Sequence, residues 1–367
     1  MRYIAYVDMD AYYVSCEIRD RPELAEAPVI VGPAPTGPES RGVVLSASYA
    51  ARKFGVRSAL PVGLAAQRCP QAVWIPPDFE KYGRIAGEIR GLLAPTADRM
   101  VPMSIDEAAL EIAAPGPSDV EAWARATQEL IRSKLRLPCS IGASPFAVVA
   151  KIASDRAKPG GIRVVPPEAT RGFLAPLPVS AIPGIGPKSA QRLEESGIRT
   201  IADLGAASPD TLRRVLGQGA PAFRALARGT PGPELGELPE DHGPRQRSLD
   251  RTLGSDTRSA GEVRDHLSEM AEELAGLLAE EGFRYQAVTV RLRWSDFTQA
   301  QHGRQLPAAH EGPAALTSEA LRLAGELLAR ERAEHGRAVR RISLAVGALV
   351  PRRGHQRSLD GPAQPRG

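Results

Sequence analysis

Short apolar runs alternate with longer amphipathic stretches along the first 165 residues of the chain. The short runs are rich in Val, Ile and Ala, as β-strands are, whereas the longer stretches repeat apolar residues at helical spacing. We expect strands at residues 3–7, 28–31, 42–46, 73–75, 101–105, 109–112, 140–143 and 162–165. Helices are expected at residues 119–136 and 145–156. This order predicts a βαββαβ sheet into which an α/β segment, residues 12–75, is inserted.

The pattern changes at two further points. Residues 166–234 contain short helical stretches that are separated by glycine turns, without a convincing strand. Residues 235–247 end a stretch rich in Pro, Gly and acidic residues, which predicts a linker. A second βαββαβ pattern follows, with strands near 247–253, 286–295, 300–306 and 340–349 and helices at 259–281 and 315–334. Residues 350–367 are polar and rich in Pro and Gly, so we expect a flexible tail.

Composition narrows the class of protein but not its partners. The 367 residues include 47 Lys+Arg and 43 Asp+Glu, so the net charge of +4 does not by itself select an acidic ligand. The chain contains no apolar run of about 18 residues, and an acidic D-x-D by residue 10 is incompatible with a signal peptide. Three distant cysteines argue against a disulfide scaffold. We therefore expect a cytoplasmic protein without a membrane partner.

Acidic residues stand at two strand ends that are otherwise strongly apolar. Asp8 and Asp10 close the first strand on one face, so Met9 between them should point into the core, and Asp106 and Glu107 stand at a predicted hairpin. Buried carboxylates are costly unless cations neutralise them, and Mg²⁺ prefers oxygen ligands. Two such ions could promote an in-line phosphoryl displacement. Either motif alone also fits capping or turn residues, and a nucleotide cyclase on a similar sheet would carry much the same acids.

A second polar group suits a triphosphate. Tyr49 and Arg52 are three residues apart and share one helical face, and Lys158 precedes a Pro-Gly-Gly turn. Arginine can bind phosphate oxygens through two hydrogen bonds, tyrosine can donate one, and lysine adds a point charge. The alternative is a pair of amphipathic helices whose cations are simply solvated.

Five motifs together carry a family resemblance. VDMDAYYVSCE, SASYAARKFGVRSALP, MSIDEA, KIASDRAKPGG and IPGIGPKSAQRLEESGI occur in the order and spacing of the Y-family translesion DNA polymerases. The chain most resembles the bacterial DNA polymerase IV branch of that family. The motifs cover residues 1–230, and the last hundred residues match mainly in pattern.

This resemblance implies an α+β multidomain fold of the right-hand polymerase type. The parts it implies are a ferredoxin-like palm (1–11 and 76–165), small fingers (12–75), a helical thumb with a helix-hairpin-helix (166–234), a linker (235–247), a βαββαβ little finger (248–349) and a tail (350–367). It also implies an error-prone, low-processivity DNA-dependent DNA polymerase for translesion synthesis, without a proofreading exonuclease. Primer-template DNA and dNTPs would be its partners, and we expect a monomer. The alternative within the family is a catalytically silent scaffold protein in a mutagenesis complex.

The resemblance assigns roles to individual residues of the palm and fingers. Two Mg²⁺ ions would be held by Asp8, Asp106, Glu107 and the backbone carbonyl of Met9, with Glu107 as the catalytic acid beside the primer 3′-hydroxyl. Asp10 matches a less essential acid. Tyr13 stands at the position of the steric gate that rejects ribonucleotides, next to Tyr12. The triphosphate would be bound by Ser46, Tyr49, Arg52 and Lys158.

The resemblance also assigns contacts to DNA and to a sliding clamp. Gly184, Gly186 and Lys188 belong to the helix-hairpin-helix, whose backbone N–H groups would bind phosphate. Arg291 and Arg293 alternate with apolar residues and would present a cationic sheet face to DNA. QRSLD occurs twice, and the second copy resembles clamp-binding peptides through Gln356, Ser358 and Leu359, although Asp360 replaces the usual second apolar residue. The first copy, at residues 246–250, leads into a predicted strand and should be used in sheet pairing.

Overall fold

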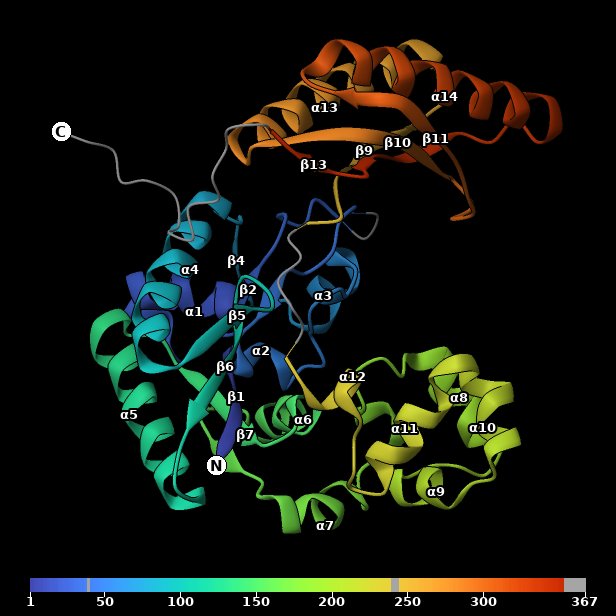
Figure 1. The fold of residues 1–367 in the computed structure, drawn as a ribbon. Helices are drawn as coiled ribbons and strands as arrows, with labels where there is room; N and C mark the ends of the chain where they lie inside the picture. Colours follow the sequence, from blue (N-terminus) through green and yellow to red (C-terminus); the bar gives the residue numbers. More distant parts are fainter. Residues whose placement is uncertain (38–39, 239–243, 353–367) are drawn as a thin grey trace. The chain divides into compact units, whose positions relative to one another are not determined.

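A computed structural model of the chain describes residues 1–37, 40–238 and 244–352. The chain divides into two compact units, Met1–Asp241 and His242–Gly367 (Figure 1). Each unit has a hydrophobic core and a main β-sheet of its own.

A five-stranded sheet forms the centre of the first unit. Its strand order is β5-β6-β1-β7-β8, and only β7 and β8 pair in parallel. The strands are β1 (Arg2–Met9), β5 (Arg99–Pro102), β6 (Glu107–Ala113), β7 (Cys139–Ser144) and β8 (Ile162–Val164). The sequence predicted all five, although β5 ends at Pro102 instead of residue 105 because the next residues form the turn into β6.

Helices cover both faces of this sheet, so its central strand is buried from Tyr3 to Met9. Helices α4 (Phe79–Leu93) and α5 (Pro117–Leu135) lie on one face and α6 (Ala147–Ala157) on the other (Figure 1). Along β1, alternate residues from Tyr3 to Met9 join the core with α4 and α5, whereas Ile4 and Tyr6 pack with α6. The prediction that Met9 is buried in the core is confirmed, since it is 2% exposed.

The inserted segment forms a small sheet of order β3-β2-β4. Its elements are α1 (Tyr12–Asp20), β2 (Val29–Val31), β3 (Ser46–Ala47), α2 (Tyr49–Arg52), α3 (Val62–Arg68) and β4 (Val73–Ile75). The strand predicted at 42–46 was wrong for most of its length. The Val44 backbone N–H donates to the Leu60 carbonyl, and the Leu45 N–H donates to the Val31 carbonyl. Neighbouring residues of this stretch therefore bond to two different segments and form no continuous ladder.

Short helices follow the central sheet, as predicted. They are α7 (Thr170–Leu174), α8 (Pro187–Glu195), α9 (Ile201–Ala206), α10 (Pro209–Leu216), α11 (Ala220–Ala227) and α12 (Pro233–Gly236). Helix α12 begins before the predicted linker and runs into it, and Leu238 is only 6% exposed within a core that includes Ile4 and Tyr6. The first part of that stretch is therefore packed on the sheet, because its few apolar residues cover an apolar face.

The second unit is a four-stranded antiparallel sheet of order β11-β10-β12-β9, with two helices against one face. Its elements are β9 (Gln246–Thr257), α13 (Ala260–Glu280), β10 (Phe283–Trp294), β11 (Gln299–His310), α14 (Pro313–Glu334), β12 (Val339–Gly347) and β13 (Val350–Pro351). The predicted βαββαβ order is confirmed. The first QRSLD copy pairs with β12, also as predicted. The tail was expected from residue 350, but Val350 and Pro351 form β13, which pairs with β10.

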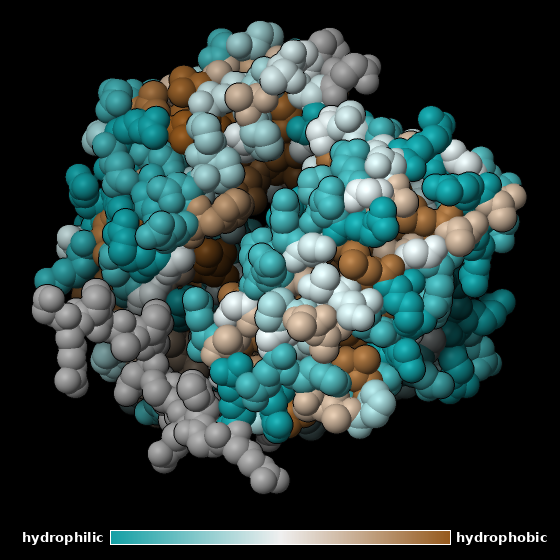
Figure 2. Space-filling view, turned by 90° about the horizontal axis from the view of Figure 1, so that it is seen from above, coloured by the Kyte–Doolittle hydropathy of each residue, from teal (hydrophilic) through white to brown (hydrophobic). Residues whose placement is uncertain are grey.

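Hydrophilic residues cover most of the face shown in Figure 2, and hydrophobic residues form separate areas among them. Among the described residues, no helix is both long and apolar enough to cross a membrane. Cys16, Cys69 and Cys139 are buried and unpaired, in line with the absence of a disulfide scaffold expected from their spacing.

One glycine allows α6 to approach the sheet closely. A Cβ atom on Gly142 of β7 would lie 2.0 Å from the backbone nitrogen of Ser154 and 2.3 Å from the carbonyl oxygen of Ala150. We expect Gly142→Ala to destabilise the first unit by about 3 kcal/mol, since overpacking against backbone cannot be relieved by a side-chain rotation. The measurement is the thermal unfolding of the full chain.

Gly83→Ala is the matched control. Gly83 lies in α4, and a Cβ there would meet nothing within 4 Å. This variant should be more stable by about 0.5–1 kcal/mol, because alanine favours helix over glycine. Equal stability of the Gly142→Ala variant and the wild type would show that α6 is free to move away from β7.

Candidate active site

Two carboxylates face each other across neighbouring strands at one end of the central sheet. Asp8 of β1 is directly opposite Glu107 of β6 in the antiparallel register, and Asp8 is only 2% exposed. Like charges in such a cross-strand pair repel, and burial strengthens the repulsion. A cation between the two side chains relieves this repulsion.

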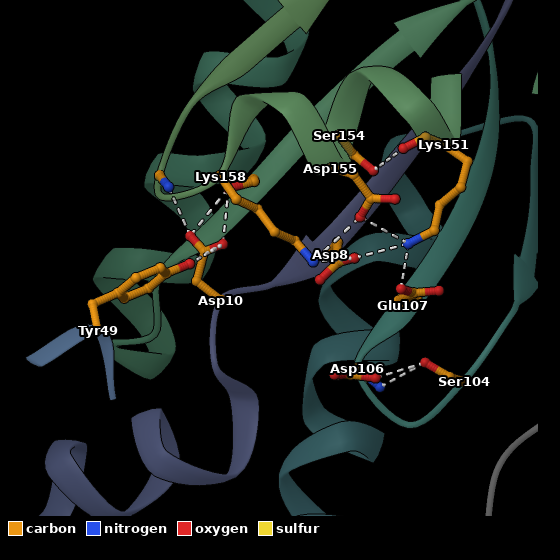
Figure 3. A network of polar contacts seen from close by, with 12 residues as sticks. Asp8, Asp10, Tyr49, Ser104, Asp106, Glu107, Lys151, Ser154, Asp155 and Lys158 are labelled. Carbon is orange, nitrogen blue, oxygen red and sulfur yellow. Dashed lines mark hydrogen bonds and ion pairs between the residues drawn. The ribbon is translucent and has the colours of Figure 1, made fainter. Parts of the chain in front are cut away.

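Lys151 in the middle of α6 and Lys158 directly after the helix supply positive charge there. The Lys151 Nζ atom lies 3.1 Å from Asp8 Oδ2, donates to Glu107 Oε1 and lies 3.3 Å from Asp155 Oδ1 (Figure 3). The Lys158 Nζ atom lies 2.7 Å from Asp8 Oδ2. The sequence analysis gave no role to Lys151 or Asp155. The available signal was their spacing, since residues 151, 155 and 158 share one face of a helix.

The charges in this group shift the ionisation of both carboxylates. Burial opposes ionisation of Asp8, but a hydrogen bond with Glu107 and the charges of Lys151 and Lys158 hold the pKa of Asp8 below its ordinary value. Burial and the neighbouring Asp8 raise the pKa of Glu107, although Lys151 opposes this. The pKa of Lys151 is raised by these acids in spite of burial, so its ammonium stays charged. Asp8 is thus the stronger anion of the pair.

Asp106 lies beside this pair but is not directed towards it. Its Oδ1 atom accepts a hydrogen bond of 2.7 Å from Ser104 Oγ in the turn before β6 (Figure 3). Its backbone is held at the end of β1, because Met9 N donates to the Asp106 carbonyl at 2.9 Å. Within the described ranges, no three acidic, His or Cys side chains are grouped as metal ligands. The structure thus brings Asp8 and Glu107 together and leaves the Asp106 carboxylate turned away.

The donor set nevertheless fits a hard divalent cation. Asp8, Glu107 and Asp106 offer carboxylate oxygens, and the Met9 carbonyl lies at the same strand end. Oxygen ligands of this kind are those that Mg²⁺ and Ca²⁺ prefer. The ammonium between Asp8 and Glu107 shows that their position is stabilised by positive charge.

Asp10 has a different environment from that of Asp8. Its Oδ2 atom accepts from the Gly160 backbone at 2.7 Å, and Ser140 Oγ donates to both of its oxygens, at 2.9 and 3.1 Å. Burial raises its pKa above the ordinary value in spite of these donors. Asp10 therefore ties the loop after Lys158 to the sheet.

The residues expected to bind a triphosphate lie in α2, in β3 and directly after α6. The guanidinium carbon of Arg52 lies 4.8 Å from the centre of the Tyr49 ring, so the two share one face of α2, as predicted. The Tyr49 hydroxyl donates to Asp10 at 3.5 Å, and the pKa of Tyr49 is raised to about 12 by burial and by Asp10. Lys158 lies beside Asp8, whereas Ser46 is buried in β3, three residues before Tyr49.

The two adjacent tyrosines of α1 differ in burial. Tyr12 is 2% exposed and donates its hydroxyl to the Tyr82 carbonyl at 2.7 Å, so it belongs to the core. Tyr13 is partly exposed, and its ring centre lies 4.8 Å from that of Tyr82 and 6.4 Å from that of Phe79. Of the two rings, Tyr13 is the one accessible to a ligand. Ala11 precedes both with a φ of 46°, which turns the chain from β1 into α1.

The glycines of the predicted helix-hairpin-helix lie directly before α8. Gly184 has a φ of +95°, which requires glycine, whereas Gly186 has a φ of −73° and caps α8. A Cβ on Gly186 would meet nothing within 4 Å, so this glycine leaves open space at the helix N-terminus. Lys188 is exposed in the first turn of α8.

The arginines expected to bind DNA lie in the second unit. Thr289, Arg291 and Arg293 alternate with the core residues of β10 and lie on the face opposite the helices. Gln356 and Leu359 of the second QRSLD copy lie outside the described residues.

Family comparisons agree with this arrangement. Residues 7–155 match the impB/mucB/samB family, and residues 244–359 match the C-terminal domain of that family. Residues 177–221 match a SAM-like helix-hairpin-helix tandem. The matched range includes α9 and α10, which the sequence analysis treated only as part of a helical region.

Individual relatives cover nearly the whole chain. DNA polymerase IV of Methanoculleus marisnigri is 36% identical over 98% of both chains, and that of Halorhodospira halophila is 36% identical over 97% of both. Among solved structures, a Y-family DNA polymerase chimera of Dbh and Dpo4 has a TM-score of 0.85 and 26% identity, over 95% of this chain and 99% of that one. An insertion ternary complex of Dbh DNA polymerase has a TM-score of 0.67 with the same coverage. The chain therefore belongs to the Y-family of DNA polymerases, in the group that contains DNA polymerase IV.

Proposed function

We propose that this chain is a DNA-directed DNA polymerase for translesion synthesis, which adds a deoxynucleotide to a primer 3′-end and releases pyrophosphate. The observation that carries the proposal is the pair of opposed carboxylates, Asp8 and Glu107, beside the cations that suit a triphosphate. Extension of a primed template by the purified chain, opposite undamaged bases and lesions, tests it.

Bound divalent metal would lower the pKa of the primer hydroxyl and stabilise the charge that develops on the phosphates. Asp8, Asp106, Glu107 and the Met9 carbonyl are the proposed ligands of two Mg²⁺ ions. Arg52 and Lys158 neutralise the triphosphate, and Tyr49 and Ser46 donate hydrogen bonds to it. The Tyr13 ring lies under the sugar and excludes a 2′-hydroxyl.

The proposed division of the chain follows the family. The central sheet forms the palm, residues 12–75 the fingers, residues 166–234 the thumb and residues 248–349 the little finger. Gly184, Gly186 and Lys188 bind the DNA backbone without reading sequence, and Arg291 and Arg293 bind it on the little-finger sheet. The error-prone, distributive enzyme acts as a monomer in the cytoplasm and has no exonuclease.

Two other functions find less support. A silent scaffold of the same family would not need the palm acids, yet Asp8, Asp106 and Glu107 are all present. A nucleotide cyclase would have no use for a helix-hairpin-helix tandem, which residues 177–221 match.

The first prediction concerns the metal ligands. Asp8→Ala, Asp106→Ala and Glu107→Ala should each reduce primer extension by about a hundredfold or more, because metal stabilisation of the transition state is worth several kcal/mol. DNA affinity, measured by fluorescence anisotropy, should stay within about twofold because it depends on cations elsewhere. Glu88→Gln, an exposed acid of α4, is the control and should extend normally. Asp106→Ala activity above roughly a few per cent of wild type would contradict the ligand set.

The second prediction concerns the choice of sugar. Tyr13→Ala should lower the ratio of kcat/KM for dNTP over rNTP, because removing the ring opens space under the sugar without touching phosphate contacts. Tyr12→Phe is the matched control, since it removes only the hydroxyl that donates to the Tyr82 carbonyl. Loss of sugar discrimination in Tyr12→Phe, with an unchanged ratio in Tyr13→Ala, would mean that the wrong tyrosine had been chosen.

The third prediction concerns the clamp. We propose that Gln356 and Leu359 bind the bacterial sliding clamp, since a tethered peptide raises the local concentration of enzyme at the primer end. Changing both to Ala should abolish clamp-stimulated extension and leave distributive extension unchanged. Deleting the tail is an alternative variant, and the deletion should begin after Arg352, because the Arg352 backbone donates to the Gly282 carbonyl at 2.8 Å. Gln364→Ala serves as the control, and undiminished stimulation in the double variant would place the clamp contact elsewhere.

A further inference from the structure

The face of the second sheet that is opposite to α13 and α14 has an unusual distribution of charge. We call it the open face and define it by the paired register from residues 246–252 of β9 across β12 and β10 to β11. Its side chains are small or uncharged, including Gly303 and Gly347, except for Arg291, Arg293, Arg341 and Asp250. Among the described residues of the open face, Asp250 is thus the one that carries a carboxylate.

Asp250 is bound to one of these three arginines. Its Oδ1 atom lies 2.7 Å from Arg341 Nη2 and 3.1 Å from Arg341 Nε, and it also accepts from Ser343 Oγ. Although burial opposes ionisation, Ser343 and Arg341, together with the charge of Arg291, hold the pKa of Asp250 below its ordinary value. The carboxylate is therefore ionised at neutral pH, and it occupies both nitrogens of Arg341 that face it.

The other two arginines of the open face contact only neutral groups in the described structure. Arg291 donates to the Gln301 side chain at 2.9 and 3.1 Å, and Arg293 donates to the Phe297 carbonyl at 3.3 Å. On the opposite side of β9, Arg247 is paired with Glu281 at 2.8 Å, beside the helices. Arginine-carboxylate pairs therefore lie near both faces of this strand.

We propose that Asp250 competes with DNA phosphate for Arg341 and so limits the affinity of the open face for DNA. This inference rests on the proposed function, which makes the open face a DNA-binding surface. A phosphate and a carboxylate use the same nitrogens of a guanidinium, so a backbone phosphate must displace Asp250 to reach Arg341. The displaced carboxylate then repels that phosphate, because the neighbouring side chains of the open face are small or uncharged and do not shield it. Asp250 thereby helps to keep the enzyme distributive.

The test compares DNA affinity over a range of salt concentrations. Asp250→Asn keeps the size of the side chain and its bond with Ser343 but removes the charge. Its affinity for a primer-template duplex, measured by fluorescence anisotropy, should rise about three- to tenfold at low salt. Because one more phosphate is neutralised, the slope of log K against log salt should steepen by about 0.9, and the gain should shrink by about threefold between 50 and 200 mM salt. Asp250→Ser should give the same result if asparagine perturbs the strand.

Two controls separate competition at Arg341 from a general change in charge. Glu281→Gln adds the same unit of positive charge on the helix side of β9, and its DNA affinity should stay within about twofold of wild type. Combining Asp250→Asn with Arg341→Ala should abolish the gain, because the freed guanidinium is gone. A gain in Glu281→Gln equal to that in Asp250→Asn, or a gain that persists without Arg341, would overturn the inference.

A failure of the proposed function has a different signature. If Arg291→Ala and Arg293→Ala bind DNA as tightly as wild type, the open face is not a DNA-binding surface and the inference falls with it. If those variants bind more weakly while Asp250→Asn equals wild type, DNA binds the face and only the role of Asp250 is wrong. Thermal unfolding of each variant verifies that the sheet is intact.

Discussion

The repulsion between Asp8 and Glu107 is the constraint on which the first unit depends. Asp8 is buried directly opposite the partly exposed Glu107, and leaving a buried charge uncompensated costs about 3–5 kcal/mol. The compensating lysines come from α6 and the residue after it, so this helix must lie close to the sheet. Gly142 permits that approach, and Asp10 holds the loop that follows Lys158. Packing and charge compensation are therefore two aspects of one arrangement.

The regular elements could be predicted because their patterns are local. Alternation along β1 gave the correct face for Met9, and the use of the first QRSLD copy in sheet pairing followed from its position at a predicted strand. The errors fall where distant segments decide the outcome. Residues 42–45 hydrogen-bond to two separate stretches, and Leu238 is buried only because an apolar sheet face lies within its reach. Neither partner is visible in the local sequence.

The candidate site shows the same division. The motifs identified the acids and the two tyrosines, but only the structure separates the buried Tyr12 from the partly exposed Tyr13. Lys151 could not be given a role from the sequence. Helical spacing shows which residues share its face, but it does not show that this face meets Asp8 and Glu107. The direction of the Asp106 carboxylate depends on its side-chain rotamer, which the sequence does not show. Its hydrogen bond with Ser104 turns the carboxylate away from Asp8. The pairing of Asp250 with Arg341 needed the register of β9 with β12, which joins residues 91 positions apart.

The buried cysteines have a consequence for the chemistry of the whole chain. Burial raises the pKa of Cys16 and Cys139 to about 12 and also raises the pKa of Cys69. Oxidants and alkylating agents attack the thiolate, which is almost absent at neutral pH when the pKa is this high. The folded chain should thus tolerate oxidising conditions that inactivate enzymes with exposed thiols. A cysteine introduced at the surface would be its single reactive thiol, suited to carrying one fluorophore.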